Sequence, residues 1–112
     1  MLLAEVRGLT VTRLDFDGSD ALTLDAAIAE AAGLLANEKV DVLVNSNGSR
    51  LACRLLLAKA GSQEVGVSGA AAHFIKPGDS ISLSSFGWMK AKAATRHEPT
   101  LVEVSGENEL PG

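Results

Sequence analysis

The residues with the clearest chemical potential are Gly18 and Ser19, which follow Phe16 and Asp17. A serine hydroxyl can attack a preceding glycine carbonyl, because glycine lacks a Cβ and adopts strained φ values that expose that carbonyl. The attack yields an ester by N-to-O acyl shift, elimination leaves dehydroalanine at Ser19, and hydrolysis then produces a pyruvoyl group. This ketone can form a Schiff base with an amine and withdraw electrons from it. The alternative interpretation is a polar turn after a strand.

A second candidate group is a pair of arginines, Arg50 and Arg54, in a stretch that alternates like a strand. A period of two places both on one face, about 13 Å apart at the Cα atoms. Guanidinium groups bind carboxylates bidentately, so the two side chains can converge on a small dianion. The alternative is an exposed strand face on which the arginines cover Ala52 and Leu56.

The segments that must position these residues read mainly as strands. Leu2 to Phe16 has the β-branched content of an irregular strand, and it leads directly to Gly18-Ser19. Thr23 is the expected N-cap of one helix, Leu24 to Ala32, and Gly33 suits its C-terminal end. This helix is the only long one that the sequence predicts.

After the helix, Lys39 to Val44 alternates as a strand and meets Asn47-Gly48, a strong hairpin signal, before the return strand Ser49 to Leu57. Further strands are expected at Glu64 to Val67, Ser80 to Phe86 and Thr100 to Val104, separated by turns at Gly61-Ser62 and Lys76 to Asp79. Gly87 to Pro99 allows a helical turn, and Glu107 to Gly112 is expected to be a loose tail. The pattern predicts a compact, mainly β barrel with one or two short helices.

Composition sets the size of the core. The chain has 112 residues, of which 46% are hydrophobic and only 4% aromatic, so Leu, Val, Ile and Ala must build the interior. We expect a single domain over residues 1–112. A chain this short buries a modest fraction of its surface alone, and an oligomer would add to its stability.

Charge and cysteine content exclude several function classes. The formal net charge of −4, without a basic stripe, argues against nucleic-acid binding. The single cysteine, Cys53, excludes an internal disulfide. No apolar stretch is long enough for a signal peptide or a membrane span, so we expect a cytoplasmic protein without membrane partners. His73 and His97 lack metal-ligand spacing with other residues, and we expect structural histidines and no metal.

Six short blocks extend these observations to almost the whole chain. They are Phe16 to Ser19, Ala31 to Leu34, Asn47 to Arg50, Val67 to His73, Pro77 to Asp79 and Gly106 to Glu109. In order and approximate spacing they resemble bacterial aspartate 1-decarboxylases, with Gly-Ala-Ala-Ala-His the most specific block. The resemblance implies a small double-psi β-barrel and autocatalytic cleavage into residues 1–18 and 19–112. It also implies a pyruvoyl group made from Ser19, without PLP, and a homotetramer with sites between subunits.

The resemblance also implies roles for individual residues. Gly18 and Ser19 provide the cleaved bond, and Arg50 matches the arginine that holds a substrate carboxylate. The turn Ser68, Gly69, Ala70 and Ala71 matches the substrate-contacting turn, where small side chains let backbone N–H groups approach a ligand. The implied reaction converts L-aspartate to β-alanine in pantothenate synthesis.

This chain departs from the family at several of these positions. Cys53 and Arg54 stand where the family has a threonine that assists processing and a tyrosine proposed as proton donor. A thiol is a weak donor, and Arg54 is a poor proton donor because a guanidinium group holds its proton firmly. Ser68 replaces an asparagine, Phe16 a tyrosine, and a lysine of the first strand has no counterpart, since the first lysine here is Lys39.

Two accounts of these departures remain open. In the first, the protein is a pyruvoyl-dependent decarboxylase of aspartate or another small acidic amino acid. Arg54 then takes over the charge role of the missing lysine at the catalytic site, and water or another group returns the proton. In the second, the protein is a barrel that does not cleave and serves as a binding or structural subunit.

Overall fold

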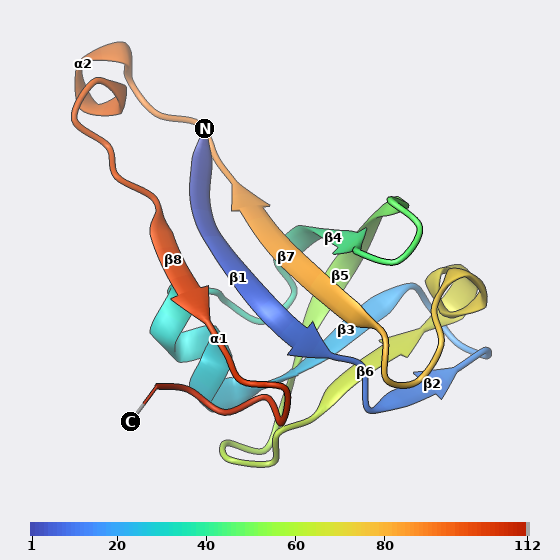
Figure 1. Cartoon of the computed structure of the whole chain (residues 1–112). Coiled ribbons are helices and arrows are strands. Elements are labelled where there is room, and N and C mark those ends of the chain that lie inside the picture. Colours follow the sequence, from blue (N-terminus) through green and yellow to red (C-terminus); the bar gives the residue numbers. More distant parts are fainter. Residues whose placement is uncertain (112) are drawn as a thin grey trace.

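The computed structural model describes residues 1–111, which form eight strands, two short α-helices and one 3-10 helix (Figure 1). The strands are β1 (Leu2–Thr10), β2 (Arg13–Asp15), β3 (Ala21–Asp25), β4 (Lys39–Val44), β5 (Arg50–Ala58), β6 (Val65–Ser68), β7 (Ser80–Phe86) and β8 (Thr100–Glu103). The helices are α1 (Ala26–Ala32), η1 (Gly69–Phe74) and α2 (Ala91–Ala94). The predicted mainly β class is confirmed. None of the helices within residues 1–111 is long and apolar enough to cross a membrane.

The first strand closes the sheet. The strand order is β2-β6-β3-β5-β4-β7-β1-β8, so β1 and β2 lie near opposite ends of the order although only Val11 and Thr12 separate them in the chain. The N–H of Val11 donates to the Asp79 carbonyl, and the N–H of Thr12 donates to the Val65 carbonyl, each at 2.9 Å. The expected single strand from Leu2 to Phe16 is therefore bent at this point, and its two halves join the ends of the sheet into a barrel.

The core is aliphatic, as the composition predicts. In β4, Val40, Val42 and Val44 are buried and the residues between them face outward. The alternation persists in β7, whose observed bounds match the predicted ones, as do those of β4. The side chains fill the barrel interior because successive residues of a strand point to opposite faces.

The predicted helix from Leu24 is wrong in its first part. Thr23 and Leu24 belong to β3, which lies between β5 and β6 and hydrogen-bonds to both. Pairing on both sides, with Leu22 and Leu24 fully buried, outweighs the local helix propensity of this stretch. The helix begins at Ala26, and Gly33 ends it in the left-handed conformation as expected.

Asp25 is the actual N-cap, and it serves a second purpose. Its buried carboxylate accepts hydrogen bonds at 2.9 Å from the N–H groups of Ala27, Gly61 and Gln63. Burial by itself would raise the pKa of Asp25, but the three donors hold that pKa below its ordinary value. One side chain therefore starts α1 and ties the turn before β6 to it.

The expectation of a loose tail is also wrong for its described part, whereas Gly112 lies outside the described residues. Asn108 is buried, its side chain accepts from the Thr10 N–H at 2.8 Å, and it donates to the carbonyls of Thr10 and Gln63 at 2.9 and 3.0 Å. Leu110 packs against the core. The segment is held because it satisfies the backbone of β1 where the ladder ends.

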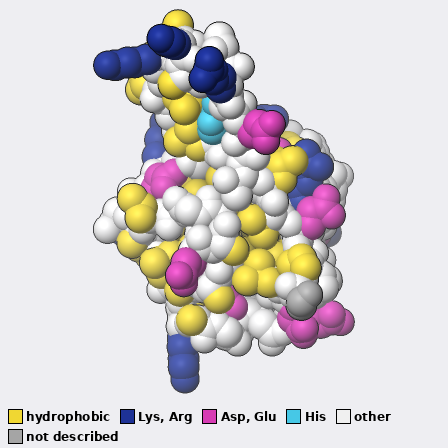
Figure 2. Space-filling view, turned by 90° about the vertical axis from the view of Figure 1, so that its left-hand side faces the viewer, with side chains coloured by type: hydrophobic (Ala, Val, Ile, Leu, Met, Phe, Trp, Pro, Cys, Tyr) yellow, Lys and Arg dark blue, Asp and Glu magenta, His cyan; other side chains and the backbone are white. Residues whose placement is uncertain are grey.

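An arm projects from the barrel between β7 and β8 and carries α2 (Figure 1). Figure 2 shows Lys and Arg side chains gathered at its tip, where Lys90, Lys92 and Arg96 border one hollow. Trp88 at its base is fully exposed, and Phe86 is half-exposed nearby. The arm therefore adds charged and apolar surface that the barrel does not cover.

Asp25→Asn should lower the free energy of unfolding by about 2–3 kcal/mol at pH 7, because it weakens a cap and leaves buried N–H groups poorly paired. Since the folded pKa is depressed, the contribution is present above the unfolded value of about 4 and is lost as the pH falls through the folded value. Urea unfolding at pH 7 and pH 3 should therefore show a smaller difference from wild type at pH 3. Exposed Glu107→Gln is the control, and an equal loss in both variants would contradict this role.

Candidate active site

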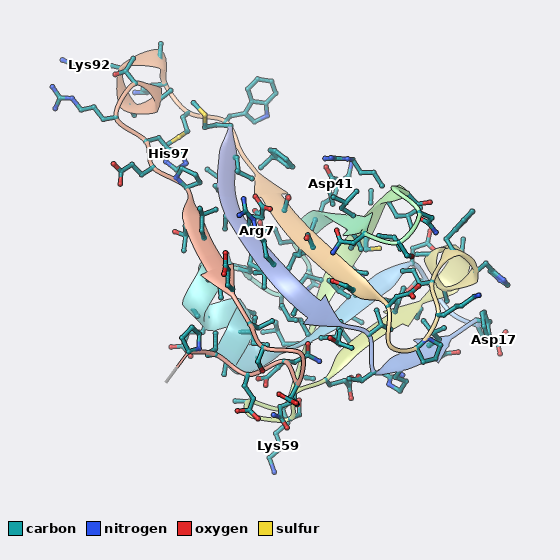
Figure 3. All side chains as sticks on the ribbon, in the orientation of Figure 1. Arg7, Asp17, Asp41, Lys59, Lys92 and His97 are labelled. Atoms are coloured by element: carbon teal, nitrogen blue, oxygen red, sulfur yellow. The ribbon has the colours of Figure 1, made fainter. Side chains whose placement is uncertain are left out.

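Gly18-Ser19 lies in an exposed turn between β2 and β3. Gly18 has a φ of +91°, a conformation that favours glycine, and no atom outside residues 17–19 lies within 4 Å of the position that a Cβ would take. The Asp17 N–H donates to the Asp15 carboxylate at 3.1 Å, and Figure 3 shows Asp17 at the outer end of the molecule beyond β2. The turn thus presents the bond that the sequence predicts to be cleaved.

The junction of β6 and η1 contacts the residues after this bond. The Ser68 hydroxyl donates to the Ser19 carbonyl at 2.9 Å, with a longer contact of 3.4 Å to the Ala21 carbonyl. The N–H of Ala70 donates to the Asp20 carboxylate at 2.7 Å. The structure therefore brings the predicted substrate-contacting turn directly to the predicted cleavage site, although about 50 residues separate them in the sequence.

Strand β5 flanks the same loop on its other side. Ala21 pairs with Arg54 in the parallel ladder between β3 and β5, and the Arg54 N–H donates to the Asp20 carbonyl at 3.3 Å. Across the antiparallel ladder, Lys39 of β4 stands opposite Arg54, and both residues are exposed. Two cationic side chains therefore project from neighbouring strands beside the loop.

Arg50 is the first residue of β5 and lies four positions before Arg54. As predicted, Arg50 and Arg54 share the exposed face, with the intervening Cys53 on the buried one. Arg50 borders a hollow of about 230 Å³ on the outer face of β1, β4, β5 and β7, together with Glu5 and Asp41. No residue of the Gly18-Ser19 turn lines this hollow.

The tip of the β4–β5 hairpin reaches the far end of η1. Asn47 Nδ2 donates to the Phe74 carbonyl at 3.0 Å. The ring of His73 lies 5.0 Å from that of Phe16, whereas Nε2 of His97 lies 2.7 Å from the Leu2 carbonyl, far from the loop. Three of the sequence blocks, at the cleavage turn, the hairpin and η1, thus meet at one end of the barrel.

Comparison with known proteins identifies the family of this chain. A family model described as aspartate decarboxylase matches residues 1–111. The chain belongs to this family. Aspartate 1-decarboxylase 1 of Frankia casuarinae is 37% identical over 110 residues, which are 98% of this chain and 71% of that protein. Aspartate 1-decarboxylase of Hyphomonas neptunium is 36% identical over 110 residues, 98% of this chain and 93% of that protein. Family membership assigns the chain to the carboxy-lyases.

The barrel type agrees with this membership. The computationally designed msDPBB_sym2 protein, a double-psi β-barrel, superposes with a TM-score of 0.51 at 15% identity, over 67% of this chain and 95% of that one. The likeness concerns the fold alone at this identity. The predicted double-psi β-barrel is confirmed.

Two departures from the aspartate decarboxylase family fall on opposite sides of β5. Cys53 is 3% exposed and faces the core, whereas Arg54 is exposed. Burial, together with the charges of Asp20 and Asp41, raises the pKa of the Cys53 thiol to about 11. The thiol therefore stays protonated near neutral pH and can act only as a weak hydrogen-bond donor.

The turn after β6 was expected to present backbone N–H groups to a substrate, but in this structure the Ala70 N–H bonds within the chain. Gly69 has a φ of +81°, and a Cβ there would contact the Asp20 side chain and lie 2.8 Å from the Asp20 nitrogen. Ala71 is buried, and the Ala70 N–H is taken by the Asp20 carboxylate. The small residues of this decarboxylase turn therefore admit Asp20 of the same chain.

Two residues of the site escaped the sequence reasoning, Asp20 and Lys39. Asp20 adjoins Ser19 in the chain, but its importance comes from its contacts with Ala70 and Arg54, which local sequence does not reveal. Lys39 is the first lysine of the chain, and only the β4–β5 register places it beside Arg54. Counting outward from a two-residue turn at Asn47-Gly48 would have placed Leu56 opposite Lys39, whereas the observed ladder is shifted by two residues and places Arg54 there.

Proposed function

We propose that the protein cleaves itself between Gly18 and Ser19 and, with the resulting pyruvoyl group, decarboxylates L-aspartate to β-alanine. The observation that carries the proposal is the exposed positive-φ turn at Gly18, followed by a Ser19 carbonyl that Ser68 holds. Family membership supports the activity, because the Frankia and Hyphomonas relatives carry that name.

The cleavage uses groups of this chain and one molecule of water. The Ser19 Oγ attacks the Gly18 carbonyl carbon, the C–N bond breaks, and Gly18 becomes an ester on the Ser19 oxygen. Loss of the Ser19 Cα proton then breaks the bond between Cβ and Oγ, expels the Gly18 carboxylate and leaves a carbon–carbon double bond at residue 19, so that residues 1–18 and 19–112 separate at this step. Water then supplies a carbonyl oxygen at the Cα of residue 19, and the nitrogen of that residue departs as ammonia.

The surroundings of Ser19 fit the group that would form there. Residue 19 is exposed, Ser68 donates to its carbonyl oxygen, and the Gly18 side of the bond is open. When formed, the pyruvoyl ketone supplies an electron sink for an amine substrate. Ser68 would keep that terminus oriented by the same hydrogen bond.

Positive charge near the loop favours an acidic substrate. Lys39 and Arg54 stand opposite one another on β4 and β5, and a second carboxylate on the substrate would pair with these cations, whereas a neutral amino acid would not. Another small acidic amino acid remains an alternative to aspartate. Since Arg54 cannot give up a proton, we propose that water or another group protonates the carbanion.

The second candidate function is a barrel that does not cleave and binds a partner. One observation favours it: the Cys53 thiol is buried and only a weak donor, at the position where family resemblance assigns a threonine hydroxyl to processing. In that account the site would bind a ligand without covalent chemistry. Cleavage decides between the two functions.

The first expected outcome is self-cleavage. An intact-mass spectrum of the purified protein should contain residues 1–18 and a shortened, amine-free chain of residues 19–112. Ser19→Ala should stay a single chain, because no hydroxyl is left to attack Gly18. A wild-type mass that remains uncleaved after long incubation at elevated temperature would remove the decarboxylase proposal and leave the binding one.

Substitutions should distinguish the roles of the two arginines. We expect Arg50→Ala to leave cleavage intact and to lower kcat/KM for aspartate about 30- to 1,000-fold, through loss of a bidentate carboxylate contact. Arg54→Tyr should maintain or raise aspartate turnover, because a phenol can give up a proton. Steady-state kinetics on fully cleaved protein test both. If Arg54→Tyr lowers activity as much as Arg50→Ala, Arg54 anchors the substrate and the substrate is not aspartate.

We also expect a homotetramer in solution. The core is small and aliphatic, Trp88 and Phe86 are exposed, and Arg50 borders a hollow to which the Ser19 turn of its own chain contributes no residue. A neighbouring copy would bring the Arg50 of one chain to the Ser19 of another. Light scattering across a concentration series should give four chains per particle. A monomer at every concentration would contradict both the assembly and this division of the site.

A further inference from the structure

Asp20, the residue immediately after Ser19, is attached to the barrel at more points than its neighbours in the loop. Its carboxylate accepts from the Ala70 N–H at 2.7 Å, and its carbonyl accepts from the Arg54 N–H at 3.3 Å. These two donors belong to η1 and to β5, which lie on the two sides of β3. Asp20 therefore bridges both elements that flank the start of β3.

The backbone around Asp20 leaves little freedom. Gly69 packs so closely that a Cβ there would lie 2.9 Å from the Asp20 Cα. Ala21, the next residue, is 1% exposed and pairs with both Ser68 and Arg54. Downstream of the Gly18-Ser19 bond, the chain is thus fixed by side-chain, backbone and packing contacts together.

The residues just before the Gly18-Ser19 bond make fewer contacts with the barrel. Gly18 meets no atom within 4 Å of its Cβ position, and residues 16 to 18 are all exposed. Their contacts are the Asp17 N–H bond to the nearby Asp15 carboxylate and the Phe16 ring beside the exposed His73 ring. The bond to be cleaved therefore joins a fixed segment to a loosely held one.

We propose that Asp20 is a positioning residue for self-cleavage, anchoring the nucleophile's segment to the Ala70 N–H while the Gly18 carbonyl stays free to reorient. This inference rests on the proposed function. An intramolecular attack needs the hydroxyl and carbonyl close and aligned, and a displacement of about 1 Å can cost 10²-fold in rate. After cleavage the same contacts keep residue 19 in place while residues 16 to 18 depart and leave room beside it.

The test compares two changes at Asp20 with a matched change elsewhere. Asp20→Ala removes the acceptor for the Ala70 N–H, whereas Asp20→Asn keeps an oxygen acceptor and removes only the charge. Asp79→Ala is the control, since Asp79 makes the same kind of bond, from the Lys76 N–H at 2.9 Å, in a turn outside this site. Each full-length variant is purified uncleaved or early in cleavage and followed by intact mass over time, with its melting temperature measured in parallel.

We expect Asp20→Ala to cleave about 100-fold more slowly than wild type, and Asp20→Asn and Asp79→Ala to cleave at nearly the wild-type rate. Similar melting temperatures for Asp20→Ala and Asp79→Ala would show that lost stability is not the cause. Asp20→Ala cleaving at the wild-type rate, or Asp20→Asn as slow as Asp20→Ala, would overturn the positioning role while leaving the proposed function standing. An uncleaved wild type would instead remove the proposed function, and this inference with it.

Discussion

The pairing of β3 between β5 and β6 is the constraint on which the site depends. Ala21 begins this strand, is almost fully buried, and is in register with Arg54 on one side and Ser68 on the other. Because both neighbours are fixed by ladder hydrogen bonds, the residues just before Ala21 can occupy only a narrow region. Ser19 and Asp20 therefore lie between the start of η1 and the exposed face of β5, whatever the preceding turn does.

Two buried polar side chains connect other segments of the barrel by hydrogen bonds to their backbones. Asp25 joins α1 to the turn before β6, and Asn108 joins the segment after β8 to the end of β1 and to Gln63. Each satisfies backbone groups where ladders end, which an aliphatic core cannot do. A small double-psi barrel has many such ends because its strands are short and cross over. The two residues thus pair backbone groups at these ends with side-chain atoms.

Two departures from the aspartate decarboxylase family, Cys53 and Arg54, lie on opposite faces of β5. Cys53 faces the core and Arg54 faces outward, because consecutive residues of a strand point to opposite sides. A change at one position therefore alters the donor inside the barrel, and a change at the other alters the charge outside it. Lys39 adds to that outer charge from β4.

The sequence by itself determined what depends on local pattern: strands β4 and β7, the hairpin at Asn47-Gly48, the shared face of the arginines, and a glycine suited to the turn before Ser19. It also contained the blocks from which the family and barrel type could be expected. Tertiary structure alone decided that Thr23 lies in a strand, because pairing on two sides outweighs helix propensity. It likewise decided the contact of Asp20 with Ala70 and the hollow that Arg50 borders with Glu5 and Asp41, since these depend on strands distant in sequence and on their register.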